Sequence, residues 1–107
     1  MYKVFRAEFP YSEDNSKVKL RPVLQLSKAY GKYKLVVVAY ITSREVEMLE
    51  TDVDLGKSQI LGLTRNSVIR LHKVQSILLS KVTAEIGFLS AEKQREVRKK
   101  LKKLFDL

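Results

Sequence analysis

At 107 residues and a net charge of +9, the chain has the size of one domain, which we expect to span residues 1–107. Its 45% hydrophobic content is that of a globular protein, and the lack of cysteine excludes disulfides and thiolate metal sites. The apolar run 35–41 is too short to cross a membrane and the start of the chain lacks the apolar segment of a signal peptide, so we expect a cytoplasmic protein. The basic excess favours a polyanionic partner such as nucleic acid.

The first third of the chain has the patterns of β-strands. Residues 4–9 alternate apolar and polar side chains, as a half-buried strand does, and Pro10 ends the run. Residues 11–17 are rich in turn formers and predict an exposed loop. Residues 20–27 predict a second strand.

A hairpin is expected from this second strand to the most hydrophobic strand, 35–41, which we expect to be central and buried on both faces. If the chain turns across Ala29–Tyr33, Arg21 comes out beside Thr42 and Ser43 near the same end of the two strands. A guanidinium next to two hydroxyls is suited to bind a phosphate. These three residues are the first indication of a nucleic-acid site.

The second half adds further short strands and ends in a helix. Acidic residues gather in 43–54, expected as a loop leading into a strand around 51–55, followed by strands at 66–71 and 74–79 and a short helix near 82–86. A terminal helix is expected to begin at Ser90 as N-cap, with one apolar face formed by Val97, Leu101, Leu104 and Phe105. Its basic face could contact RNA or a membrane, but a solvated face is favoured. The pattern predicts a mainly β fold: a small SH3-like β-barrel of five to seven short strands, with a short helix and a C-terminal amphipathic helix.

Several sequence blocks, in order and at sensible spacing, resemble the MazF/PemK toxins of type II toxin–antitoxin systems. They are Phe-Pro-Tyr at 9–11, a polar loop, Lys-Leu-Arg-Pro-Val-Leu-Gln-Leu-Ser at 19–27, the run 36–43, Gly-Leu at 62–63, Ser-Val-Ile-Arg-Leu at 67–71 and Ile-Gly-Phe-Leu-Ser at 86–90. The resemblance covers nearly the whole chain, and its strength lies in the number of blocks in register. Two departures are Gln25, where an aliphatic residue is usual, and His72, where acidic residues are common.

The resemblance implies a homodimeric, sequence-specific endoribonuclease that cleaves single-stranded messenger RNA without a metal or cofactor. RNA carries its own nucleophile, the 2′-hydroxyl, so such cleavage requires positioning, proton transfer and charge stabilisation. By resemblance, Arg21 would bind the scissile phosphate, and Thr42 with Ser43 would hydrogen-bond a phosphate oxygen or the 2′-hydroxyl. The wider RNA-binding groove, which the acidic tail of a cognate antitoxin would also occupy, is expected to include Lys17, Lys19, Gln25 and Arg44.

The residues leave some alternatives open. Glu8 or Glu13 could be the general base, and nothing selects between them. Gln25 could read a base or face water. A non-catalytic SH3-like RNA-binding or ribosome-binding module fits the composition as well as a nuclease does. A poison of DNA gyrase resembling the CcdB toxins is less favoured, because those toxins depend on a C-terminal Trp and this chain has none.

Overall fold

The computed structural model describes residues 1–11, 14–43, 47–58 and 62–107, with the side chains of residues 10–18 left out of that description. The described chain forms six strands, a single 3-10 turn and one helix. In chain order they are β1 (Lys3–Tyr11), β2 (Asp14–Gln25), β3 (Leu35–Ser43), β4 (Asp52–Ser58), β5 (Leu63–Leu78), η1 (Leu79–Lys81), β6 (Val82–Phe88) and α1 (Ala91–Phe105).

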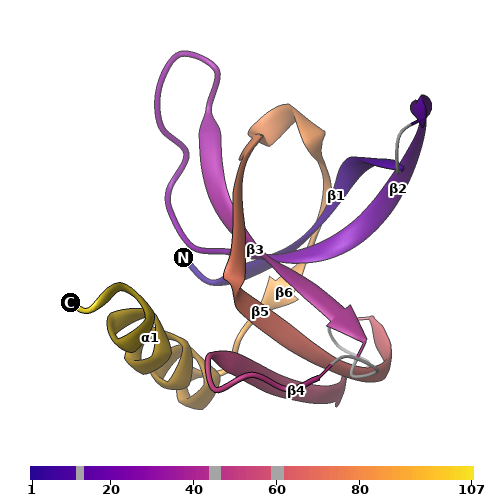
Figure 1. Cartoon of the computed structure of the whole chain (residues 1–107). Coiled ribbons are helices and arrows are strands. Elements are labelled where there is room, and N and C mark those ends of the chain that lie inside the picture. The colour runs from indigo at the N-terminus through magenta and orange to yellow at the C-terminus, as the bar shows by residue number, and fades with distance from the viewer. Residues whose placement is uncertain (12–13, 44–46, 59–61) are drawn as a thin grey trace.

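The strands form one antiparallel sheet in the order β4-β5-β3-β2-β1-β6. The sheet curls strongly on itself into a half-barrel, and α1 lies beside β4 and β5 (Figure 1). The predicted mainly β class, a small bent barrel with a C-terminal helix, is therefore confirmed. The predicted hairpin is confirmed as well, because β2 pairs with β3 through Val23–Tyr40, Leu24–Ala39 and Gln25–Val38.

Both faces of β3 are buried, as expected for the central apolar strand. Ala39 and Ile41 belong to the core cluster that α1 covers with Val97, whereas Val36 and Val38 pack with Phe5 in a second cluster. A strand that contributes to two cores can have apolar residues in succession rather than in alternation. This explains why Leu35–Ile41 is the longest apolar run of the chain.

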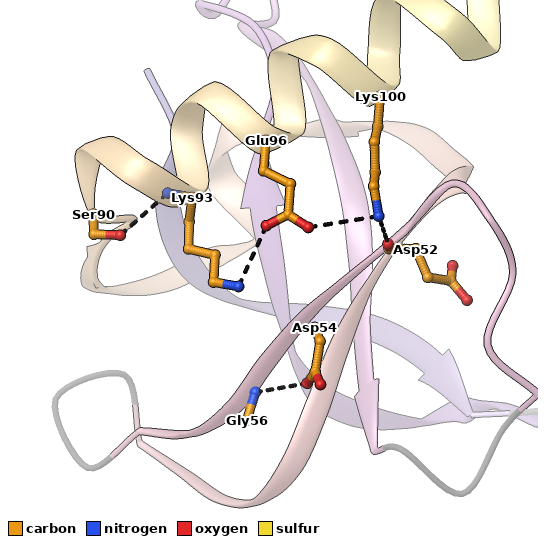
Figure 2. Close-up of polar contacts among 7 residues, drawn as sticks. All are labelled: Asp52, Asp54, Gly56, Ser90, Lys93, Glu96 and Lys100. Atoms are coloured by element: carbon orange, nitrogen blue, oxygen red, sulfur yellow. Dashed lines mark hydrogen bonds and ion pairs between the residues drawn. The ribbon is translucent and has the colours of Figure 1, made fainter.

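Helix α1 begins and ends with local caps that the sequence encodes. The Ser90 side chain accepts a hydrogen bond from the Lys93 amide at 3.2 Å, and Asp106 adopts the left-handed conformation that ends the helix. Lys100 donates to the Asp52 carbonyl of β4, and Figure 2 shows this contact next to the Lys93–Glu96–Lys100 ion pairs on the same helix. The predicted N-cap is confirmed. Val97 is fully buried, whereas Phe105, expected on the same face, is 55% exposed.

Three expectations about local structure were wrong. The loop predicted for 11–17 is mostly strand, because β1 reaches Tyr11 and β2 begins at Asp14. The strands predicted at 66–71 and 74–79 are one long strand, β5, with an irregularity between them. The helix predicted near 82–86 is β6, whose side chains alternate between half-buried and exposed because it pairs with β1.

Candidate nucleic-acid interface

Arg21 and Thr42 come together where β2 and β3 leave their common ladder. The ladder ends at the pair Val23–Tyr40, and Arg21 and Thr42 each lie two residues beyond that pair. Both residues line two adjoining hollows in the surface. A guanidinium and a hydroxyl therefore share the wall between two concave surfaces.

The first hollow, which we name the cationic pocket, has a volume of about 290 Å³. It is lined by Phe9, Arg21, Tyr40, Ile41, Thr42, Arg70 and Lys73. Three of these side chains are cations and none is acidic. The half-buried Tyr40 ring meets Phe9 edge to face at a centroid distance of 5.2 Å. Positive charge beside an aromatic ring is the combination that single-stranded nucleic acids bind, through their phosphates and bases.

An irregularity in β5 exposes two polar side chains, one of which lines this pocket. β3 pairs Ala39 with Val74 and Tyr40 with Arg70, so residues 71–73 of β5 have no partner on β3. Leu71 is buried, whereas His72 and Lys73 are exposed, and Lys73 lines the cationic pocket. A strand bulge re-aims side chains that a regular ladder would hold in alternation.

The second hollow, which we name the hydroxyl pocket, also has a volume of about 290 Å³. Arg21 and Thr42 continue into it, together with the hydroxyls of Ser43, Thr64 and Ser67. Lys19 and Arg65 add positive charge at the same surface. Hydroxyls both donate and accept hydrogen bonds, so this pocket suits ribose and base edges as well as phosphate oxygens.

The structure brings together four of the seven residues expected at the site. Arg21, Thr42, Ser43 and Lys19 line the hydroxyl pocket. Lys17 lies on β2, but its side chain is outside the described part of the structure, and Arg44 lies outside the described residues altogether.

Gln25 is not part of either pocket. It lies at the other end of the β2–β3 ladder, where its side chain accepts from the Lys3 amide at 3.4 Å and donates to the Ser27 carbonyl at 2.9 Å. Of the two candidate bases, Glu8 is half-buried on β1 and lines neither pocket, and Glu13 lies outside the described residues.

Arg70 and Lys73 were missed by sequence reasoning, although both line the cationic pocket. A signal for Arg70 was available, because it is the one charged residue in the apolar run Val68–Leu71. A charged side chain in a buried strand is rare unless it is paired. Lys73 had no comparable signal, since its direction depends on the bulge.

The described residues form neither a cluster of metal-ligating side chains nor a helix that could span a membrane. Residues 1–11, 14–43, 47–58 and 62–107 contain no group of three or more His, Cys, Asp or Glu side chains placed to hold a metal ion. Within the same ranges, no helix has the length and apolar character needed to span a membrane.

The comparisons with known proteins agree with the resemblance seen in the sequence. The family model "PemK-like, MazF-like toxin of type II toxin-antitoxin system" matches residues 2–105. The Mycobacterium tuberculosis toxin MazF-mt6 superposes with a TM-score of 0.76 at 27% identity, covering 98% of this chain and 97% of that one. A second structure, described as a crystal structure of an Mtb toxin, gives a TM-score of 0.63 at 27% identity over 78% of this chain and 90% of that one.

A further solved structure shares the fold alone. It is an endoribonuclease in complex with its cognate antitoxin from a mycobacterial species, with a TM-score of 0.73 at 15% identity over 99% of this chain and 93% of that one. No curated protein sequence matches the chain. Since the family model spans almost the entire sequence, the chain belongs to the PemK-like, MazF-like toxins of type II toxin–antitoxin systems.

Proposed function

We propose that this toxin is a metal-independent endoribonuclease that cleaves single-stranded messenger RNA at specific sequences. The observation that carries the proposal is that Arg21 and Thr42 both line two adjoining hollows with positively charged linings. Substrate messenger RNA would place its action in the cytoplasm.

In the proposed reaction, the 2′-oxygen of the ribose attacks the neighbouring phosphorus and loses its proton. The bond from phosphorus to the 5′-oxygen then breaks, and that oxygen takes up a proton. The products are a 2′,3′-cyclic phosphate and a 5′-hydroxyl end, so atoms and charge balance without an external reactant. Each non-bridging oxygen gains negative charge in the pentavalent transition state.

Arg21 is the group proposed to stabilise that charge. Its fork of donors fits two oxygens of one phosphate, and no ion-pair partner competes for it among the described residues. Thr42, with Ser43 beside it, is proposed to hydrogen-bond a phosphate oxygen or the 2′-hydroxyl and so to hold the nucleophile in line. Lys17, Lys19 and Arg44 are proposed to bind flanking phosphates, and Gln25 to contact RNA at the far end of β2.

Two partners follow from the family. As a toxin of a type II pair, the protein is proposed to be neutralised by an antitoxin whose acidic tail competes with RNA for the cationic pocket. We also propose a homodimer. Leu35 and its cross-strand partner Leu78, 47% and 38% exposed, lie beside the exposed Leu79 and offer apolar surface for a second copy.

The test is cleavage of a long single-stranded RNA by purified protein in EDTA. Wild type should give recurrent cuts with 5′-hydroxyl and cyclic-phosphate ends, and Arg21→Ala should give none. Arg95→Ala is the matched control, because it removes the same charge from an exposed position on α1 and should cut normally. Intact RNA that the wild type binds with a steep salt dependence would instead support the non-catalytic RNA-binding module.

A further inference from the structure

Arg70 lines the cationic pocket, and its guanidinium also contacts a buried carboxylate, that of Asp52. It lies on β5 between Tyr40 of β3 and Asp52 of β4, which are its cross-strand partners on either side. Its side chain is only 11% exposed, yet it lines the pocket that Arg21 and Thr42 also line. A nearly buried arginine that reaches a surface hollow presents its terminal nitrogens there.

The carboxylate that holds Arg70 belongs to Asp52, which has no exposed surface. Its Oδ2 accepts the Leu49 amide at 2.8 Å, and its Oδ1 lies 3.3 Å from the Nε of Arg70. Its backbone carbonyl accepts from Lys100, and Figure 2 shows its carboxylate directed away from that lysine. Asp52 is therefore fixed by α1 through its backbone and is free to hold Arg70 with its side chain.

The ion pair adds little stability compared with a pair of apolar residues at the same positions. Burying both charges costs several kcal/mol of desolvation, so such pairs contribute little over apolar residues of similar size. This pair is also imperfect, because Asp52 Oδ1 and Arg70 Nε face each other without a hydrogen bond from any described residue. Its clearer effect is to set the direction of the guanidinium.

His72 holds the other end of the same guanidinium. Its Nε2 lies 3.2 Å from the Nη2 of Arg70, and its Nδ1 lies 3.7 Å from Asp52 Oδ1. Arginine can only donate, so Nη2 of Arg70 is the donor and Nε2 of His72 the acceptor in this contact. The bulge of β5 that exposes His72 thus also orients Arg70.

Arg70 still has donors to offer the pocket. A guanidinium carries five N–H groups; one on Nη2 contacts His72, and the one on Nε faces Asp52. The remaining donors, on the terminal nitrogens, have no partner among the described residues. Asp52 offsets one of the three cations that line the pocket, and Arg21 and Lys73 still favour an anion there.

We propose that Arg70, positioned by Asp52 and His72, binds a second phosphate of the RNA next to the phosphate held by Arg21. The proposal rests on the proposed ribonuclease function and deepens it. Arg21 on β2 and Arg70 on β5 are separated by β3, and both line the cationic pocket, where two long side chains can reach consecutive phosphates. Arg70 is a binding residue in this scheme, and Asp52 and His72 are positioning residues.

The first experiment measures binding of a 2′-O-methyl RNA oligonucleotide at several salt concentrations. This RNA lacks the nucleophile, so binding is measured apart from cleavage. Arg70→Gln alone would leave Asp52 buried and unpaired, so the main variant is Asp52→Asn/Arg70→Gln, which removes both charges and keeps the net charge of +9. We expect affinity to fall about tenfold and the slope of log K against log salt to flatten by about 0.7.

Two comparison variants sharpen the result. Arg95→Gln lowers the net charge at an exposed site on α1 and should leave affinity and slope almost unchanged. Arg70→Lys keeps the charge but loses the fork, so it should keep the slope while weakening binding. If the double variant binds RNA as the wild type does, the proposal is wrong. If the double variant keeps its affinity for RNA but loses affinity for poly-L-glutamate, the pocket binds an acidic peptide and the proposal is also wrong.

The positioning role of His72 is tested by a double-mutant cycle. His72→Ala should weaken RNA binding severalfold in the wild type and have no further effect in the Asp52→Asn/Arg70→Gln background. Equal losses in both backgrounds would show that His72 acts independently of Arg70, against the proposal. Cleavage of ordinary RNA is scored separately: a wild type that binds but never cuts contradicts the nuclease function and leaves the Arg70 result standing as a binding site.

Discussion

Asp52 and Arg70 form an ion pair between neighbouring strands, with Oδ1 of the carboxylate 3.3 Å from Nε of the guanidinium and no exposed surface on the aspartate. The pair connects the strand that α1 covers to the cationic pocket on the sheet. The core and the candidate site are therefore linked through the buried Asp52–Arg70 ion pair. Substituting one or both members of this pair can separate its effect on stability from its effect on RNA binding.

Asp52→Ala should strongly destabilise the fold. It removes the acceptor of the Leu49 amide and leaves the nearly buried Arg70 without its counter-charge. Breaking a buried pair by removing one partner costs about 3–5 kcal/mol. Urea denaturation monitored by circular dichroism would measure the free energy of unfolding.

The control for Asp52→Ala is Asp52→Leu/Arg70→Met, which replaces both charges by apolar side chains. It should recover most of the lost stability, because no unpaired charge remains. If Asp52→Ala costs less than about 1 kcal/mol, the pair is solvated in solution and the network does not hold Arg70 rigidly.

The helix cap gives a second stability prediction. The Ser90 hydroxyl accepts the Lys93 amide at the first turn of α1, so Ser90→Ala should lower the free energy of unfolding by about 0.5–2 kcal/mol. The urea midpoint should shift without a change in the m-value. Ser90→Asp retains an acceptor and adds a favourable charge at the helix N-terminus, and it should match or exceed the wild type. A stable Ser90→Ala protein would mean that α1 depends on its packing alone.

Val97 and Phe105 separate the apolar face of α1 into a buried and an exposed part. Val97 has no exposed surface, so Val97→Ala should cost about 2 kcal/mol for two lost methyl groups and the cavity. Phe105→Ala should cost much less, since that ring is 55% exposed. Thermal unfolding of the two variants under identical conditions would compare them. A larger loss from Phe105→Ala would show that its ring is covered in solution, for example by a second copy of the chain.

The same pair of residues shows what sequence patterns could and could not predict. Helical spacing placed Val97 and Phe105 on one face, but it does not tell where the neighbouring sheet ends. The central strand β3 and the hairpin to β2 were predictable, because an apolar run and a turn are local signals. That hairpin predicts Arg21 and Thr42 near the same end of the two strands, and both line the same two hollows.

Features that depend on pairing between distant strands were not predictable. The polar residues His72 and Lys73 looked like the break between two strands, whereas a bulge accommodates them within β5. The segment Val82–Ile86, where we predict a helix from the sequence, is part of strand β6 because it pairs with β1. The Arg70 network needs the register of β4 against β5 and the position of α1, neither of which a local pattern contains.

The sharpest prediction for activity concerns Arg21 and Thr42. Arg21→Lys keeps one charge but cannot bind a phosphate with two parallel hydrogen bonds. If Arg21 stabilises the charge that develops on the phosphate, kcat should fall about 10²–10³-fold, with a smaller change in KM. Thr42→Val keeps the shape of the side chain and removes its hydroxyl. It should slow single-turnover cleavage about tenfold, the value of one neutral hydrogen bond to the reacting group.

The matched control for Thr42→Val is Thr83→Val, the same substitution at an exposed position on β6 outside both pockets. It should cleave at the wild-type rate. Steady-state kcat and KM for Arg21→Lys, and single-turnover rates for the two threonine variants, would be measured on a short RNA that contains one cleavage site. If Arg21→Lys changes only KM and leaves kcat intact, the guanidinium binds ground state and transition state alike, and charge stabilisation must come from another group at the junction of the two pockets.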